Sequence, residues 1–265
     1  VYKRQARFHQ YIVLEDFHYL KSEVQKDFAI ELKACSELCF IIVGVWLDEN
    51  KLVIYNGDLT GRIVPVNADL WNEDELREVI QKGEDFLNIR FKESFTSEAI
   101  KASSGNVYIV QETCHRACNE SGIHKTVVGE RRLVGDGLNA RSLVAEIIQE
   151  QSGRYNAFIT NYASGFQETA LAMHKWLLYP ILTSSIEELS KGLTYRSIRS
   201  KITSGHPQGK NLNPGNITQA LKAVSSLQLS KSIQPIILDY DESNLTLHIV
   251  DKGFLIWLSM QDLSL

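Results

Sequence analysis

Two neighbouring acidic residues, Glu15 and Asp16, directly follow a short apolar run at residues 10–14. The run is rich in β-branched residues, as expected of a strand that is buried on both faces. Open α/β sheets bind ligands beyond the carboxyl ends of their parallel strands, so acids at this place suit a metal-nucleotide site. The alternative is structural, because two acids can also end a strand and begin a helix, where carboxylates match the helix dipole.

The familiar glycine-rich ligand-binding motifs do not occur in the 265 residues. The string closest to the phosphate-binding loop G-x-x-x-x-G-K-S/T lies at residues 205–211. It has one residue too few between its glycines, Asn after the Lys and no strand before it, so we interpret it as a loop. G-x-G-x-x-G and G-x-S-x-G are also absent, which gives no support to a dinucleotide-binding enzyme or an α/β-hydrolase.

The four cysteines form two pairs with a spacing of four residues, Cys35 with Cys39 and Cys114 with Cys118. A tetrahedral zinc site would need both pairs to converge, with C-x-x-C-like turns that the sequence lacks. We therefore interpret the cysteines as buried helical thiols in a reducing compartment.

Residues 191–231 carry seven Lys and Arg residues and no Asp or Glu, although the whole chain has a net charge of −4. Such a basic patch is the electrostatic signature of phosphate contacts with nucleic acid. The residues that we expect to contact DNA are Arg196, Arg199, Lys201, Lys210, Asn216, Thr218, Gln219 and Lys222. Acids follow at 239–242, which disfavours insertion of that region into a minor groove, and contact with a protein partner is an equal alternative.

The element order predicts how these residues are positioned. An amphipathic helix is expected over residues 21–37, with Val24, Phe28, Leu32 and Cys35 on its apolar face, and a buried strand over 39–46. Together with the first strand they make a βαβ unit with a parallel sheet. Asn72 is the expected N-cap of a helix that stops at Gly83, and two more helices follow over 97–103 and 106–121. Residues 125–138 are interpreted as a linker or loop, with helices again over 140–150 and 168–177.

The last eighty residues show a different order of elements. Short helices are predicted over 186–189 and 194–202, a loop over 206–216 and a helix over 217–229. Extended segments are predicted over 233–240, 245–250 and 254–258. Three helices followed by a β-hairpin is the order of a winged helix-turn-helix, with the helix over 217–229 as its recognition helix.

Several of these segments resemble AAA+ and STAND-like P-loop ATPases, in particular the initiator-like group that ends in a winged helix. YIVLEDFHYL at 11–20 resembles the Walker B strand and CFIIVGVW at 39–46 the sensor-1 strand. DLTGR at 58–62 is similar to the segment that carries the arginine finger, and residues 72–89 and 103–123 resemble the helical lid. The resemblance implies a partial α/β P-loop core with parallel strands, an all-α lid and a C-terminal winged helix-turn-helix.

The same resemblance implies ATP and Mg²⁺ as cofactors. Glu15 takes the place of the Mg²⁺-binding acid and Asp16 that of the water-orienting acid, which reverses the usual Asp-Glu order. Arg62 would act on the nucleotide of a neighbouring subunit, which implies a homo-oligomer. The alternative for Arg62 is a surface arginine or a pair with Asp58. The Walker A loop would precede residue 1, so we expect an N-terminally truncated ATPase that is inactive by itself and does not hold ATP tightly.

Length and composition leave room for this organisation. The expected parts are the end of the ATPase core at 1–70, the lid at 71–124, a linker and helical connector at 125–185 and the winged helix at 186–265. Neither a secretory signal nor a long apolar segment is present, so we expect a cytoplasmic protein that does not span a membrane. The alternative function is that of a non-enzymatic winged-helix protein that binds DNA or a protein, with the α/β part as a scaffold.

Overall fold

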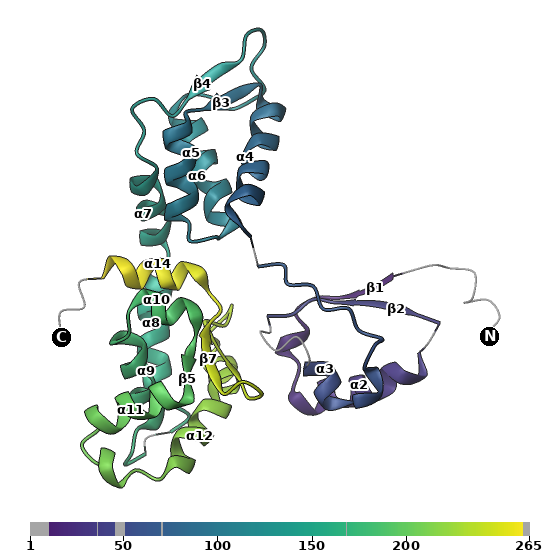
Figure 1. Ribbon diagram of the computed structural model, residues 1–265, viewed down its shortest axis with the longest axis vertical. Helices are drawn as coiled ribbons and strands as arrows, with labels where there is room; N and C mark the ends of the chain where they lie inside the picture. The colour runs from purple at the N-terminus through teal and green to yellow at the C-terminus, as the bar shows by residue number, and fades with distance from the viewer. Residues whose placement is uncertain (1–10, 36, 46–50, 70, 168, 262–265) are drawn as a thin grey trace.

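The computed structural model describes residues 11–35, 37–45, 51–69, 71–167 and 169–261 (Figure 1). The described residues have a mixed α/β fold with three hydrophobic clusters. We name three units after these clusters: the N-terminal unit (11–63), the helical unit (71–143) and the C-terminal unit (144–261). A long segment leads from the N-terminal unit to the helical unit, which lies above the C-terminal unit in Figure 1.

The N-terminal unit is built on a parallel pair of strands. β1 (Tyr11–Leu14) pairs with β2 (Cys39–Ile42), and α2 (Ser22–Glu31) connects them, which confirms the predicted strand–helix–strand order. Short helical segments complete the unit: η1 (Phe17–Tyr19), η2 (Leu32–Ala34), α3 (Lys51–Tyr55) and η3 (Gly57–Leu59). The predicted strand over 39–46 ends at Ile42, and residues 46–50 lie outside the described part of the chain.

The prediction that both strands are buried on two faces is wrong for the described residues. Leu14 and Ile42 pack against the cluster formed by the helices, whereas Tyr11 is 68 % exposed and Val13 51 % exposed. Side chains alternate between the two faces of a strand, so one face of this pair contacts the helices and the other carries exposed apolar side chains. Parallel sheets are normally covered on both faces.

The predicted apolar face of the helix over 21–37 is confirmed in part, because Phe28 and Leu32 pack against the cluster of the N-terminal unit. Val24 is exposed, and the buried side chains of the helix are Gln25 and Ala29. Gln25 is buried because its Nε2 donates a hydrogen bond to the carbonyl oxygen of Leu20 at 2.8 Å and reaches that of Phe17 at 3.4 Å. A local capping role therefore overrides the hydrophobic pattern here.

The helical unit contains α4 (Glu73–Leu87), α5 (Glu93–Ala102), α6 (Val107–Glu120) and the first turn of α7 (Ala140–Glu150), whose later residues belong to the C-terminal unit. The predicted N-cap is confirmed, since the side chain of Asn72 accepts from the Glu75 amide in a reciprocal capping box. The predicted end at Gly83 is wrong, because α4 continues to Leu87 and is followed by Asn88 in the left-handed region. α5 likewise begins four residues before the predicted start.

The helical unit is not all-α as predicted. β3 (Ile89–Phe91) pairs in parallel with β4 (Arg132–Val134), which lies inside the segment interpreted as a linker. Both strands have three residues, too few for an alternating pattern to stand out in the sequence. The pair joins residues that are distant in the chain and extends the core of this unit to Leu143.

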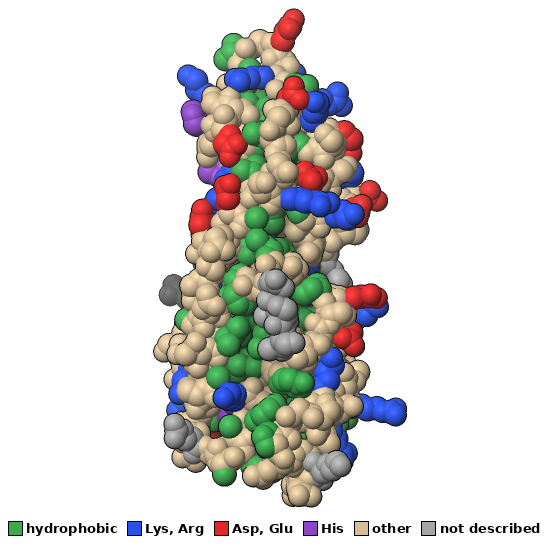
Figure 2. All heavy atoms as spheres, turned by 90° about the vertical axis from the view of Figure 1, so that its left-hand side faces the viewer, with side chains coloured by type: hydrophobic (Ala, Val, Ile, Leu, Met, Phe, Trp, Pro, Cys, Tyr) green, Lys and Arg blue, Asp and Glu red, His purple; other side chains and the backbone are tan. Residues whose placement is uncertain are grey.

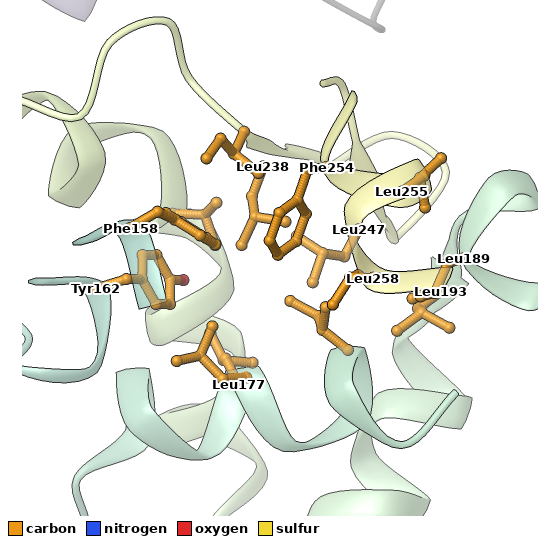
Figure 3. Close-up of a cluster of buried hydrophobic side chains, with 14 of the residues drawn as sticks. Phe158, Tyr162, Leu177, Leu189, Leu193, Leu238, Leu247, Phe254, Leu255 and Leu258 are labelled. Atoms are coloured by element: carbon orange, nitrogen blue, oxygen red, sulfur yellow. The ribbon is translucent and has the colours of Figure 1, made fainter. Parts of the chain in front are cut away.

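The C-terminal unit combines helices with a small antiparallel sheet. The helices are α8 (Ser152–Ala163), α9 (Met173–Leu182), α10 (Ile186–Lys191), α11 (Tyr195–Gly205), η4 (Gly209–Asn211), α12 (Pro214–Lys222), α13 (Val224–Ser230) and α14 (Lys252–Met260). The strands β5 (Leu193–Thr194), β6 (Leu238–Asp241) and β7 (Thr246–Ile249) lie in the order β5–β7–β6. Side chains from α8, α9, α10, this sheet and α14 converge on one core (Figure 3).

Two predictions for this unit need correction. Residues 254–258, predicted as extended, belong to α14, whose side chains from Phe254 to Leu258 are all buried. A short run of apolar residues does not distinguish a buried strand from a buried helix. The predicted recognition helix begins at Pro214, three residues early, and is divided at Ala223 into α12 and α13.

No helix in the described ranges is long and apolar enough to cross a membrane. On the face shown in Figure 2, acidic and basic side chains are interspersed over the helical unit, and hydrophobic side chains lie along the middle of the face below it.

Candidate functional site

Glu15 and Asp16 lie at the carboxyl edge of the parallel pair, where the sequence places them. Leu14 and Ile42 are partners at the ends of β1 and β2, and the Val43 amide donates to the Leu14 carbonyl at 2.9 Å. The chain then turns, and the amide of Phe17 donates to the carbonyl of Val43 at 3.1 Å. Both acids are exposed, so their carboxylates are free to meet a cation from solution.

Asp16 makes this turn with a φ of 55°, in the left-handed region that Asp tolerates better than most residues. The carboxylate acts on its neighbour Tyr19: burial and the charge of Asp16 raise the pKa of Tyr19, whereas the charge of Arg154 lowers it. Arg154 belongs to α8 of the C-terminal unit. The edge of the strand pair that carries Asp16 is therefore close enough to the C-terminal unit for the charge of Arg154 to act on Tyr19.

Arg62 is exposed and follows η3, where its amide donates to the carbonyl of Leu59 at 2.9 Å. The ion pair of Asp58 is formed with Lys33, at 2.5 Å. The hydrogen bond and charge of Lys33 lower the pKa of Asp58, and Arg62 adds a smaller attraction. Arg62 is thus an exposed residue whose charge still attracts Asp58.

A cavity of about 430 Å³ lies where the N-terminal, helical and C-terminal units meet, and we name it the junction cavity. Val45, which follows β2, contributes from the N-terminal unit. The remaining lining comes from the connecting segment, the start of α6, α8, and the residues on either side of the β6–β7 hairpin: Asp69, Trp71, Gly105, Asn106, Val107, Tyr108, Ile109, Gln151, Arg154, Pro235, Ile236, Val250, Asp251, Lys252 and Gly253. Glu15, Asp16 and Arg62 do not line it.

Asp251 organises one wall of the junction cavity. One carboxylate oxygen accepts from the amides of Gly253 at 2.9 Å and Phe254 at 3.3 Å, which caps α14. The other oxygen pairs with the guanidinium of Arg154. Position 253 requires glycine because a Cβ would lie 2.4 Å from the hydroxyl oxygen of Tyr155. The Nε of Arg154 is buried and has no hydrogen-bond partner within the described residues.

Lys252 also lines the cavity. Its Nζ donates to the carbonyl oxygen of Asp69 at 2.6 Å and to that of Gly105 at 3.2 Å. These bonds fasten the first turn of α14 to the connecting segment and to the residue before Asn106, the N-cap of α6. Both acceptors are uncharged carbonyls, so the bonds do not neutralise the ammonium charge.

The lining of the junction cavity suits an uncharged, flat group. Two acids, Asp69 and Asp251, balance two bases, Arg154 and Lys252. Aromatic and apolar surface comes from Trp71, Tyr108, Ile109, Pro235 and Ile236. A site with balanced charge and aromatic walls favours a polar heteroaromatic ring over a multiply charged group.

Among the cations between residues 191 and 231 whose side chains are described, three are paired with acids that lie outside that segment. Lys191 pairs with Glu187 at 2.7 Å, Lys201 with Glu188 at 3.9 Å and Lys222 with Glu242 at 2.5 Å. These contacts reduce the basic patch that the sequence alone indicates.

The other expected DNA contacts are divided between two helices. Arg196 and Arg199 of α11 are exposed, and neither forms an ion pair with another described residue. On α12, Gln219 is exposed, whereas Asn216 and Thr218 are half-buried, and the Thr218 hydroxyl donates to the Pro214 carbonyl at 3.2 Å. The side chain of Lys210 lies outside the described part of the chain.

The four cysteines are free, and their environments differ. Cys114 and Cys118 lie on α6, as expected of helical thiols, but Cys39 is exposed on β2. Among the described residues, no group of three or more His, Cys, Asp and Glu side chains could hold a metal ion.

Sequence reasoning missed Arg154, Asp251 and Lys252. Asp251 is an N-cap signal for a helix, but the short apolar run that follows at 254–258 is also typical of an extended segment. Nothing near Arg154 in the sequence marks it, because its partner lies 97 residues away.

A comparison with protein-family models gives no match for this chain, and no curated protein matches its sequence.

Proposed function

We propose that this chain is part of an AAA+/STAND-like P-loop ATPase of the cytoplasm whose nucleotide places its base and ribose in the junction cavity. The observation that carries the proposal is the position of Val45. It follows β2 at the carboxyl edge of the parallel pair and lines the same cavity as Gly105 of the helical unit and Lys252 of the C-terminal unit. A ligand bound there contacts all three units, which is what a nucleotide-dependent switch between arrangements requires.

Different residues of this region suit the different parts of a nucleotide. The aromatic side chains of Trp71 and Tyr108 and the balanced charges fit the base and ribose. The phosphates would extend toward the carboxyl edge, where the exposed carboxylates of Glu15 and Asp16 are the oxygen ligands that Mg²⁺ prefers. Bound Mg²⁺ would neutralise charge on the phosphates, with Glu15 beside the ion and Asp16 orienting the attacking water.

Arg62 acts between subunits in this proposal. Its exposed guanidinium reaches the phosphates of a neighbouring copy and stabilises the charge that develops during phosphoryl transfer. The complete protein is therefore a homo-oligomer in which each site borrows one cation from its neighbour.

The phosphate loop itself is not among these 265 residues. The exposed apolar face of the parallel pair, including Tyr11, Val13 and Ile41, supports a larger α/β core in which further elements cover it. We therefore propose that the chain is a fragment of a regulatory ATPase. Alone it holds ATP weakly and is inactive in hydrolysis.

Thermal unfolding with Mg·ATP tests this function. Millimolar Mg·ATP should raise the melting temperature of the chain by about 3 °C, because a ligand that binds only the folded state stabilises it by mass action. Tyr108→Ala should abolish the shift, since the side chain is 57 % exposed and can be removed without loss of the fold. Phe86→Ala, which removes an 80 % exposed aromatic from α4 outside the cavity lining, should keep it.

Two results would refute the proposal in different ways. A complete absence of stabilisation by Mg·ATP would leave the chain as a non-enzymatic binding protein with a scaffold α/β part. Tight, micromolar Mg²⁺-dependent binding would contradict the claim that the chain holds ATP only weakly without a phosphate loop.

The order of elements in the C-terminal unit supports a second function, binding of double-stranded DNA or a protein through a winged helix-turn-helix. Helices α10, α11 and α12–α13 precede a hairpin, and the sheet order is β5–β7–β6. In this proposal α12 is the recognition helix, and the exposed arginines Arg196 and Arg199 contact phosphates. The contact between Lys222 and Glu242 joins α12 to the hairpin turn and lowers the charge that α12 presents.

A further inference from the structure

A second cavity, of about 500 Å³ and open to solvent on one side, lies between α4 and α6 of the helical unit, and we name it the lid cavity. It shares no lining residue with the junction cavity. Val79, Gly83 and Leu87 of α4 recur at a spacing of four, and Val110 and Cys114 of α6 do the same, so each helix presents one face to it.

Gly83 keeps the lid cavity open. Glycine inside a helix lowers its stability, and Gly83 lies well within the fifteen residues of α4. A Cβ built on Gly83 would meet no atom within 4 Å, so no neighbour requires glycine at this position. A larger side chain here would extend into the cavity.

The polar groups of the lid cavity gather where α6 ends. The side chain of Asn119 lies 3.2 Å from Nε2 of His115 and 3.3 Å from Nδ1 of His124. All three side chains line the cavity, and His115 and His124 are exposed to solvent. The opposite walls are apolar, with Ile80 and Phe91 among their residues.

The charges around the lid cavity disfavour an anion. Burial, followed by the influence of Cys118 and Glu84, raises the pKa of Cys114 to about 12, so this thiol stays protonated and neutral. The carboxylate of Glu112 lies 3.5 Å from Nδ1 of His115 and adds negative charge beside the polar end.

We propose that the lid cavity binds a neutral amphipathic small molecule, with its apolar body between α4 and α6 and one uncharged hydrogen-bonding group at Asn119. Pockets of about 300–1,000 Å³ with mostly apolar walls and a few polar groups are typical of small-molecule sites. The site is independent of nucleotide binding, because it lies within a single unit and uses none of the residues assigned to ATP.

Fluorescence titration of the full chain with N-phenyl-1-naphthylamine tests the proposal, since this neutral probe has two aromatic parts and one N–H group. Wild type should bind it saturably. Gly83→Leu should weaken binding at least tenfold, because the new side chain fills the cavity. Gly83→Ala, which adds one methyl group, should bind within threefold of wild type. Gly153→Leu is the matched control, as a helical glycine of α8 with open space around it, and should bind as wild type does.

Hydrogen exchange then locates the probe. Bound probe should slow exchange in peptides from α4 and α6 and leave peptides from α11 and α12 unchanged. Absence of saturable binding, equal binding by wild type and Gly83→Leu, or protection confined to the exposed face of β1 and β2 would each overturn the proposal. A circular dichroism melt of Gly83→Leu with a cooperative transition shows that lost binding is not lost folding. Failure of ATP to stabilise the chain would leave these outcomes unaffected.

Discussion

The ammonium nitrogen of Lys252 lies 3.2 Å from the carbonyl oxygen of Gly105 and so joins the first turn of α14 to the start of α6. The two residues are 147 positions apart in the chain. The same ammonium group contacts the carbonyl of Asp69 in the connecting segment. One side chain thereby links the C-terminal unit to the helical unit and to the segment that leads from the N-terminal unit.

Removal of this side chain should loosen the link. We expect Lys252→Ala to lower the free energy of unfolding by about 2 kcal/mol, because two charge-assisted hydrogen bonds are lost. Protease cleavage should also become faster in the connecting segment at residues 63–69. Denaturant unfolding and timed proteolysis measure the two effects. Lys175→Ala, at an exposed lysine of α9, is the control, and equal stability of the two variants would contradict this role of Lys252.

Asp251 has two functions that substitutions can separate. Asn at this position can still cap α14 but cannot pair with Arg154, whereas Ala loses both interactions. We expect Asp251→Ala to lower the free energy of unfolding by about 3 kcal/mol and Asp251→Asn by about half as much. Chemical denaturation of both variants checks the order. An equal loss in both would show that the cap contributes nothing measurable.

The sequence predicts the elements that depend on local chemistry. The capping box of Asn72, the strand–helix–strand order from Tyr11 to Ile42 and the helix over 140–150 are confirmed. Each of these elements is determined by residues that are close together in the chain, through a cap or through the spacing of apolar residues. The acids Glu15 and Asp16 lie at the predicted strand edge for the same reason.

Features that depend on contacts between residues far apart in the chain could not be predicted from the sequence. β3 and β4 are three residues each and become recognisable only when paired across the helical unit. The apolar run 254–258 predicts an extended segment but belongs to α14, whose side chains from Phe254 to Leu258 are all buried in the core of the C-terminal unit and so show no helical period. The junction cavity is formed by residues from three units, and its key pair, Arg154 with Asp251, has no local signature.

Gln228 should be essential for the C-terminal unit. Its buried side chain donates to the Leu238 carbonyl at 2.7 Å and accepts from the amides of Ile237 at 2.7 Å and Leu238 at 3.0 Å. We expect Gln228→Leu, which is similar in size, to cost about 3 kcal/mol, because buried backbone groups lose their partners. Thermal denaturation measures this loss. The exposed Gln219→Ala on α12 should change stability little, and a cost below about 1 kcal/mol for Gln228→Leu would contradict the prediction.

DNA binding should depend on the arginines of α11. A gel shift at low salt should show that Arg196→Ala and Arg199→Ala each weaken binding of duplex DNA and reduce the salt slope by about one. Lys191→Ala should have less effect, because this lysine is already paired with Glu187. If wild type does not bind duplex DNA at low salt, the C-terminal unit is a protein-binding module.

The proposed nucleotide position at the junction cavity is tested most directly by photo-crosslinking with 8-azido-ATP, followed by mass spectrometry of the labelled peptides. With millimolar probe and Mg²⁺, the account predicts labelled peptides that contain residues 105–109, 235–236 or 250–253, and loss of the label when unmodified ATP is added in excess. Label found only on other segments, or label that excess ATP does not reduce, would contradict a nucleotide site at this junction.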